Sequence, residues 1–361
     1  MKTPLDYARE ACDMMMRRFA APDLPPKGQF HYHQGVFLSG MEKTWELTGD
    51  DRYISYIQEW VDSIIDSCGD ITKFNPGQLD DLQPGILLFP LLERTGDERY
   101  RMALETVAHA MTVSPKCANG GFWHKSWYRQ QMWLDGLYMA GPFLAMYGAK
   151  FNQPELFALD ARQAELMRQV TRDDKTGLWF HAWSENRLPA WADKETGRSP
   201  EFWGRAIGWV PVALLEELEY IPAGDPSREK LAAIACDLLR ALLPWQDEKT
   251  GLWYQVVNKG DDPRNWLETS CTCLYACGLM MAVRMGLMEK DVLAQAWKGY
   301  QGVIDRLTYD EAGNVQIGGV CIGTCVGDYE HYINRPVSTN DLHGVGAYLL
   351  MCAEAARAER S

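Results

Sequence analysis

The stretch Thr48-Gly49-Asp50-Asp51-Arg52-Tyr53 recurs as Thr95-Gly96-Asp97-Glu98-Arg99-Tyr100, 47 residues later. In each copy a helical pattern ends before the Gly, and an amphipathic pattern, over 51–66 or 98–113, begins after it. Gly is favoured just past the end of a helix, and Asp is favoured as the cap of the next one. The repeat therefore predicts helices joined in pairs by short turns.

A second repeat pairs Lys175-Thr176-Gly177-Leu178-Trp179-Phe180 with Lys249-Thr250-Gly251-Leu252-Trp253-Tyr254, 74 residues later. A looser relative is Gly121-Phe122-Trp123-His124. Each of these segments follows a helical pattern and precedes, after a loop of variable length, another apolar helix. Internal repetition of this kind is typical of folds built from one repeated supersecondary unit.

Six helical segments are apolar nearly all round, as expected of buried inner helices. They start near Gln34, Asp81, Asp135, Arg205, Ser270 and Asp341. Six more charged, one-sided segments alternate with them as outer helices, near 5–19, 51–66, 98–113, 154–171, 226–243 and 289–306. This alternation predicts an all-α fold, an (α/α)6 toroid of six helical hairpins with short β-like loops, forming a single domain over residues 1–361.

The composition excludes some classes of function. The net charge of the 361 residues is −13, and no basic cluster occurs, so a nucleic-acid-binding protein is not expected. No run of 18 apolar residues is present, so no membrane span is expected. Residues 1–16 lack the apolar segment of a signal peptide, which favours a cytoplasmic protein. The sequence does not indicate an oligomeric state.

Neither a metal nor a cofactor is expected. The ten cysteines are scattered, and the spacing of Cys271, Cys273 and Cys277 fits a zinc site poorly, so these are expected to be small packed residues. Cys321 and Cys325 form a second close pair and are interpreted in the same way. No P-loop, GxGxxG or HExxH motif occurs, and no set of three or four metal ligands is apparent.

Two predicted inner helices begin with the same pattern, Leu79-Asp80-Asp81-Leu82 and Leu134-Asp135-Gly136-Leu137. Inner helices of a toroid begin at one rim, so these carboxylates are expected to converge there. One interpretation is helix capping. The other is acid–base chemistry, because Asp135 is flanked by aromatic residues. A helix N-terminus lowers a carboxyl pKa, whereas burial and a neighbouring carboxylate raise it, and the sequence does not decide which prevails.

Other polar residues stand among aromatic ones. His181 lies between Trp179 and Trp183, and Arg205 lies between Trp203 and Trp209 at the start of a predicted buried helix. Since an unpaired buried charge is costly, Arg205 needs an anionic partner, either an internal acid or the carboxylate of a substrate. Several tryptophans fall in Gly-rich loops, where flat aromatic faces suit a sugar-binding cleft; these are Trp123, Trp127, Trp179, Trp183, Trp191 and Trp253.

Taken together, these motifs resemble family 105 of the glycoside hydrolases, the unsaturated rhamnogalacturonyl hydrolases, which are related to the unsaturated glucuronyl hydrolases of family 88. The resemblance covers nearly the whole chain. It rests on Leu79-Asp80, Trp133-Leu134-Asp135, the run Phe202-Trp203-Gly204-Arg205-Ala206-Ile207-Gly208-Trp209, and the ending Arg335-Pro336-Val337-Ser338-Thr339-Asn340-Asp341-Leu342-His343-Gly344.

The resemblance implies roles for individual residues. Asp135 matches the general acid/base, and Asp80 matches a second acidic residue at the sugar. The matched substrate-binding positions are His181, Arg205, Trp203, Trp133, His124 and Trp209. A further contact before the first inner helix falls on Tyr32 or His33, and whether Asp80 or Asp81 faces the sugar is open.

The implied substrate is a pectin-type oligosaccharide that ends in a 4,5-unsaturated uronic acid. The implied reaction is hydration of its C4=C5 double bond, without metal or cofactor. Two alternatives remain open at this point. One is a conventional glycoside hydrolase that uses Asp135 with Asp80 or Asp81 as an acid and base pair. The other is a sugar epimerase-like toroid that uses histidines such as His181 and His343.

Overall fold

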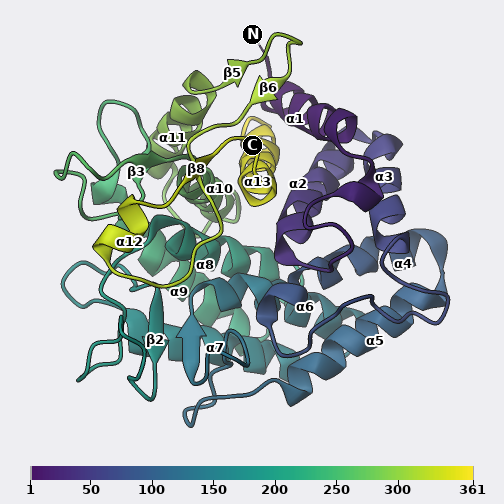
Figure 1. Cartoon of the computed structure of the whole chain (residues 1–361), viewed down its shortest axis with the longest axis horizontal. Helices are drawn as coiled ribbons and strands as arrows, with labels where there is room; N and C mark the ends of the chain where they lie inside the picture. The colour runs from purple at the N-terminus through teal and green to yellow at the C-terminus, as the bar shows by residue number, and fades with distance from the viewer. Residues whose placement is uncertain (1, 361) are drawn as a thin grey trace.

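The computed structural model describes residues 2–360 and confirms the toroid. Figure 1 shows an inner group of helices surrounded by an outer group. The inner helices are α2 (Tyr32–Thr48), α4 (Leu88–Thr95), α6 (Asp135–Lys150), α8 (Gly204–Glu217), α10 (Thr269–Arg284) and α13 (Leu342–Ala358). The outer helices are α1 (Pro4–Arg18), α3 (Asp51–Asp62), α5 (Glu98–Val113), α7 (Glu155–Thr171), α9 (Pro226–Leu242) and α11 (Leu293–Asp305).

Contacts between successive inner elements close the ring. The second inner helix does not start near Asp81 as predicted. There the chain forms two short 3-10 segments, η2 (Leu79–Asp81) and η3 (Gln83–Leu87), before α4 begins at Leu88. Pro84 lies in η3, and a proline disfavours the α conformation of the residue before it, here Gln83, which works against a regular α-helix across this stretch.

Helices α2 and α13 meet where the first and last hairpins close the ring. Glycines allow their backbones to approach closely at this seam. A Cβ on Gly346 would collide with the backbone carbonyl of Val36, and a Cβ on Gly40 would lie 2.6 Å from the Leu349 Cβ. The two ends of the chain are thereby packed against each other.

The turn repeat has the structure that its sequence predicts. Gly49 and Gly96 end α2 and α4 with φ of 66° in both, a left-handed conformation that favours glycine. Asp50 and Asp97 then cap α3 and α5 by accepting the backbone N–H of Arg52 and Arg99. The two copies therefore place their outer helices in the same way.

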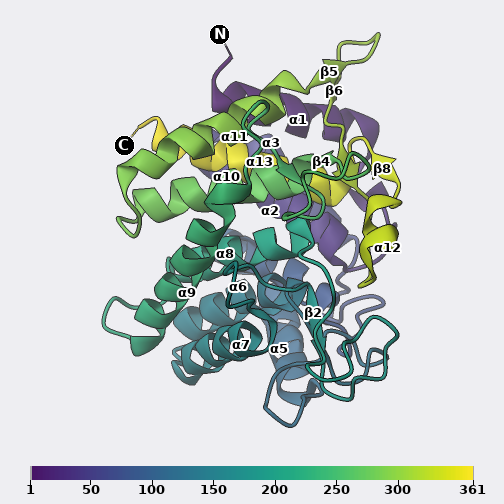
Figure 2. The same cartoon turned by 90° about the vertical axis from the view of Figure 1, so that its left-hand side faces the viewer.

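The loops between the helices contain four short antiparallel strand pairs. They join β1 (Gln131–Trp133) with β2 (Ala182–Ser184), β3 (Trp253–Tyr254) with β4 (Leu267–Glu268), β5 (Thr308–Tyr309) with β6 (Val315–Gln316), and β7 (Val320–Cys321) with β8 (Val337–Ser338). The remaining elements are the five-residue helix α12 (Tyr329–Ile333), which the sequence does not predict, and the 3-10 segments η1 (Ala21–Asp23), η4 (Leu243–Trp245) and η5 (Lys290–Val292). In Figure 2, β2, β8 and α12 lie on one side of the helices.

The cysteine interpretation holds with one exception. Cys271, Cys273, Cys277 and Cys321 are buried, as expected of small packed residues, whereas Cys325 is exposed. Among residues 2–360, no helix is both long enough and apolar enough to cross a membrane.

The core between α6, α7 and α8 contains two carboxyl groups, those of Asp160 and Glu217. Both lie against Gly141 of α6, where a Cβ would be 3.0 Å from Asp160 Oδ1 and would collide with Glu217 Oε1. Burial raises the pKa of Asp160 to about 7 and raises the pKa of Glu217 as well. The two groups therefore retain protons in the folded protein that they lose in the unfolded chain.

Because of the buried Asp160–Glu217 pair, the stability of the folded protein is expected to fall as the pH rises. Between the ordinary pKa of Asp160, 3.8, and its raised value of about 7, the unfolded chain releases protons that the folded chain keeps, so the free energy of unfolding falls. Each pKa unit of difference corresponds to about 1.4 kcal/mol. Replacing both groups with amides, Asp160→Asn with Glu217→Gln, is expected to flatten the dependence of melting temperature on pH. Asp174→Asn, at an exposed position, is the control; an unchanged slope in the double variant would contradict the assignment.

Candidate active site

A short sheet brings Asp135 and His181 together. Strand β1 pairs with β2 so that Trp133 lies opposite Ala182, and the backbone N–H of Leu134 donates to the carbonyl of His181 at 3.0 Å. Asp135 follows as the first residue of α6. Leu134, and not Asp135, occupies the N-cap position of α6.

The Asp135 carboxylate is paired with the imidazole of His181. Nε2 of His181 lies 3.1 Å from Asp135 Oδ2, and Nδ1 lies 2.6 Å from the hydroxyl of Tyr332 in α12. The backbone N–H of Gly327 donates to the same hydroxyl, so the hydroxyl proton is free to be donated to Nδ1. This network favours the tautomer whose Nε2–H donates to Asp135.

The structure also decides the direction of the pKa shift of Asp135. Burial raises this pKa, but the hydrogen bond and charge of His181, aided by His124, outweigh it, so the pKa lies below its usual value. A neighbouring carboxylate is not among the main influences on the pKa of Asp135. In the free protein, Asp135 is therefore a carboxylate.

Asp80 is surrounded by nitrogen atoms at the same rim. Lys125 Nζ lies 2.6 Å from its Oδ2, His124 Nε2 lies 3.3 Å from its Oδ1, and His31 Nε2 lies 3.7 Å from Oδ2. Burial raises the pKa of Asp80, but these three neighbours more than offset it and hold the pKa at about 2. Asp80 is thus ionised throughout the neutral range.

Asp81 makes different contacts from those of Asp80. Its Oδ2 accepts the backbone N–H of Asn75 at 3.0 Å, and burial raises its pKa to about 7. It therefore fastens the loop before η2, while Asp80 is the carboxylate that contacts the histidines and Lys125. This geometry favours Asp80 over Asp81 as the residue near a sugar.

Aromatic side chains surround these groups. Trp133 stacks on His124 and on Tyr128, with ring centroids 4.5 and 5.0 Å apart. Val326 and Trp191 complete this cluster. Of the loop tryptophans, Trp127 is exposed and Trp123, Trp183 and Trp191 are half-buried, but Trp179 and Trp253 are fully buried and belong to the core.

Arg205 has internal partners, which was one of the two alternatives for this residue. It is only 2% exposed. Its guanidinium donates to the backbone carbonyls of Cys321 and Ile322 at 2.6 and 2.9 Å, lies 3.9 Å from Glu268, and stacks over Trp203 with its Cζ 4.6 Å from the ring centroid. In the free protein its charge is balanced without a substrate.

The two tryptophans beside Arg205 differ in position. Trp203 stacks on Tyr332 and makes a tilted ring contact with His181, with centroids 5.8 and 4.7 Å away, so it supports the Asp135–His181 pair. Trp209 is 1% exposed and packs against Tyr138 of α6, 4.6 Å between centroids. Trp209 is therefore packed against the neighbouring inner helix in the core, and its assignment as a substrate-binding residue stays a prediction.

His33 stands at the beginning of α2 together with His31 and Tyr32, all half-buried. Its Nδ1 lies 3.0 Å from Nδ1 of His31, and its ring lies 5.3 Å from that of His343. His31 and Tyr332 are not among the site residues predicted from the sequence. The His31-Tyr32-His33 run was a signal for the first, whereas nothing in the pattern around Tyr332 indicates that it reaches His181.

Known proteins of similar sequence and fold identify the family of this chain. Residues 7–359 match the model of Glycosyl Hydrolase Family 88. A solved family 105 glycoside hydrolase from C. acetobutylicum ATCC 824 is 31% identical, with a TM-score of 0.92 over 97% of this chain and 99% of that one. The curated relative "Unsaturated rhamnogalacturonyl hydrolase YesR" of Bacillus subtilis is 28% identical over 260 residues, 70% of each chain.

The unsaturated glucuronyl hydrolase of Bacillus sp. GL1 shares the fold, with 17% identity and a TM-score of 0.69 over 96% of this chain and 94% of that one. The resemblance to families 105 and 88 drawn from the motifs is therefore confirmed. Because the family model spans nearly all of the described residues, this chain belongs to glycosyl hydrolase family 88 and is a glycoside hydrolase.

Proposed function

We propose that the protein removes a 4,5-unsaturated uronic acid from the non-reducing end of pectin-derived, rhamnogalacturonan-type oligosaccharides. The observation that carries this proposal is the Asp135–His181 pair, 3.1 Å apart, with the His181 ring in edge-to-face contact with Trp133. The relationship to YesR supports a pectin-type substrate. Residues 1–361 would act as one catalytic domain.

The free carboxylate of Asp135 must gain a proton before it acts as an acid. A bound uronate brings a second negative charge and excludes water, and both changes raise the pKa of a neighbouring carboxyl group. His181 helps in this step, because an imidazole between Asp135 and Tyr332 can share a proton with the carboxylate. The proton is then held at the Asp135–His181 pair.

The reaction follows from that proton. Asp135 donates it to C4 of the unsaturated uronate, and positive charge develops at C5 and the ring oxygen. Water adds at C5 and gives a proton back to the Asp135 carboxylate. The resulting hemiketal opens and expels the remaining oligosaccharide. Asp80, fixed as an anion by Lys125 and His124, would hold hydroxyl groups of the same sugar.

A panel of lyase-generated unsaturated disaccharides, followed by the ultraviolet absorbance of the alkene, tests this proposal. We expect absorbance to be lost with rhamnogalacturonan-derived substrates and no cleavage of the saturated analogues. A conventional hydrolase would cleave saturated analogues and leave the alkene intact. An epimerase would release no sugar from either. Either outcome would overturn the proposal.

The hydroxyl of Tyr332 is expected to contribute modestly to turnover. Tyr332→Phe removes the partner of His181 Nδ1, 2.6 Å away, and leaves the contacts of the ring with His181 and Trp203 in place. A neutral hydrogen bond contributes about 0.5–1.5 kcal/mol, so kcat/KM should fall about two- to tenfold. Tyr329→Phe, in the same short helix, is the matched control and should retain full activity. Equal activities of the two variants would exclude Tyr332 from positioning His181.

A further inference from the structure

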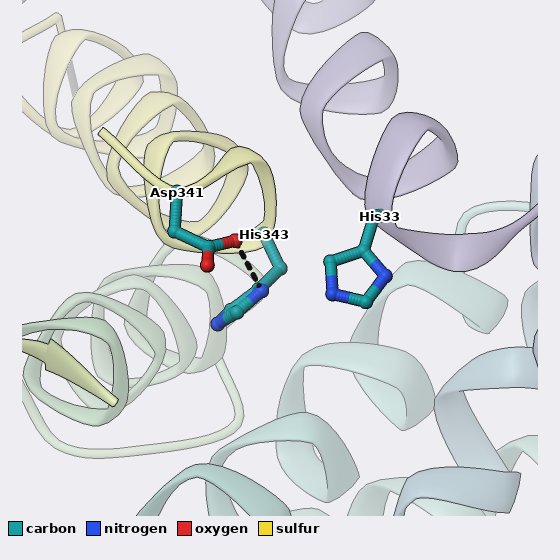
Figure 3. Close-up of side chains that lie close together, drawn as sticks. All are labelled: His33, Asp341 and His343. Carbon is teal, nitrogen blue, oxygen red and sulfur yellow. Dashed lines mark ion pairs between the residues drawn. The ribbon is translucent and has the colours of Figure 1, made fainter. Parts of the chain in front are cut away.

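The beginnings of α2 and α13 bring three potential metal ligands together across the seam of the toroid. His33 comes from α2, and Asp341 and His343 come from the start of α13. One ligand atom of each lies within 4.8 Å of the others. Figure 3 shows the His33 ring directed towards the pair formed by Asp341 and His343. No such set is apparent in the sequence, because its members lie at opposite ends of the chain.

The contacts of His343 indicate that its Nδ1 carries no hydrogen when the imidazole is neutral. Its Nε2 lies 3.0 Å from the carbonyl oxygen of Cys321, which only accepts, so Nε2 carries a hydrogen. In the neutral imidazole, Nδ1 then has a lone pair, and this atom lies 2.8 Å from Asp341 Oδ1. Two acceptors at that distance repel each other unless a cation, either a proton or a metal ion, lies between them.

His33 contributes a third lone pair, which a proton shared by the other two residues would not use. Its Nδ1 is engaged by Nδ1 of His31 at 3.0 Å, and His31 Nε2 lies 3.7 Å from the Asp80 carboxylate. An Nε2–H of His31 directed at that anion leaves His31 Nδ1 as the acceptor and makes His33 Nδ1 the donor. The Nε2 of His33 is then free to bind a ligand.

His343 and His33 each have a hydrogen-bond partner at the nitrogen that faces away from the proposed metal, as is typical of metal-binding histidines. Such a histidine commonly donates its other N–H to a carbonyl, a carboxylate or another fixed acceptor, which sets the tautomer and the orientation of the ring. His343 has the Cys321 carbonyl and His33 has His31 in this position. Two imidazoles and one carboxylate are donors that suit Zn²⁺ and neighbouring divalent transition metals.

We propose that His33, Asp341 and His343 bind a divalent transition-metal cation that clasps the first and last inner helices of the toroid. The site does not include Asp135, and this proposal does not depend on which sugar the protein acts on. Because the ligands span the closure of the ring, a bound cation stabilises the folded chain over the unfolded one, which has no preformed site.

The test uses the full-length protein after dialysis against EDTA and then against metal-free buffer. Zn²⁺ is added in a calorimetric titration, and the melting temperature is measured at increasing Zn²⁺. We expect one equivalent to bind and the melting temperature to rise with its concentration. His33→Ala and Asp341→Asn should each weaken binding at least tenfold and abolish the rise. His109→Ala, at an exposed position of α5, should behave as the wild type.

Co²⁺ is the second probe, because the exposed thiols of Cys68 and Cys325 are other potential Zn²⁺ ligands. A site of nitrogen and oxygen donors gives visible Co²⁺ absorption without a thiolate charge-transfer band. Absence of binding to the wild type, equal binding by the His33→Ala variant, or a thiolate band would each overturn the proposal. The first of these results would mean that a proton holds Asp341 and His343 together.

Discussion

Replacing Asp135 with Asn is expected to lower kcat by about 10²–10⁴-fold, the contribution that a positioned acid or base typically makes. An amide cannot donate a proton to C4 or take one from water. The change is nearly isosteric, and the Asn carbonyl oxygen can still accept the Nε2–H of His181, 3.1 Å away in the wild type. The fold and the melting temperature should therefore be retained.

Single-turnover loss of alkene absorbance with a saturating unsaturated disaccharide is the appropriate measurement, because it isolates the chemical step from product release. Asp174→Asn, on an exposed side chain, controls for the change of charge. If Asp135→Asn kept more than about a tenth of wild-type kcat, the expected loss would be absent and Asp135 would not be the acid. The other carboxylate at the rim, Asp80, would then be the candidate.

The helical hairpins could be predicted from the sequence because their signals are local. Gly49 and Gly96 end helices through a backbone conformation that side-chain sterics reserve largely for glycine, and Asp50 and Asp97 cap the helices that follow. Neither signal depends on a distant contact. The exception was the second inner helix, where Pro84 and the adjoining 3-10 turns delay α4 to Leu88. Apolar periodicity does not distinguish these turns from a regular helix.

The candidate site was only partly predictable. Asp135, Asp80, His181 and Trp133 stand in recognisable motifs and lie together in the structure. Asp135 and His181 meet through the pairing of β1 with β2, but the pattern cannot show which nitrogen of His181 faces which partner. The direction of the pKa shift at Asp135 depends on that detail, because a hydrogen bond from His181 outweighs burial.

Contacts between residues far apart in the sequence account for the remaining differences between the predicted and the observed site. The partners of Arg205 come from 268–322, a region whose packing cannot be read from the residues next to Arg205. Trp209 follows Arg205 in the sequence motif, but its ring packs against Tyr138 of α6 in the core, a contact that the residues beside it do not indicate. His343 likewise reaches His33 only because the last hairpin packs against the first, and Tyr332 reaches His181 across 151 residues of the chain.

Arg205→Lys is expected to lower the melting temperature clearly, although the charge is kept. The guanidinium of Arg205 donates to the carbonyls of Cys321 and Ile322 at 2.6 and 2.9 Å while its plane stacks on Trp203. A lysine ammonium is a point charge without this planar fork, so it cannot reproduce both hydrogen bonds and the stacking. Each buried acceptor left unpaired costs about 1–3 kcal/mol.

Melting temperature and kinetics should be measured on the same purified variant, with an unsaturated uronate disaccharide as substrate. Arg94→Lys is the matched control, because Arg94 makes an exposed ion pair with Asp51, and such pairs contribute only about 0–1 kcal/mol. A structural Arg205 predicts a much larger loss of melting temperature than the control, with KM near the wild-type value at low temperature. An unchanged melting temperature with a raised KM would instead identify Arg205 as the partner of the substrate carboxylate. The burial of Arg205 beneath the 320–322 segment favours the first result, because a substrate carboxylate would have to compete with two backbone carbonyls that already hold the guanidinium.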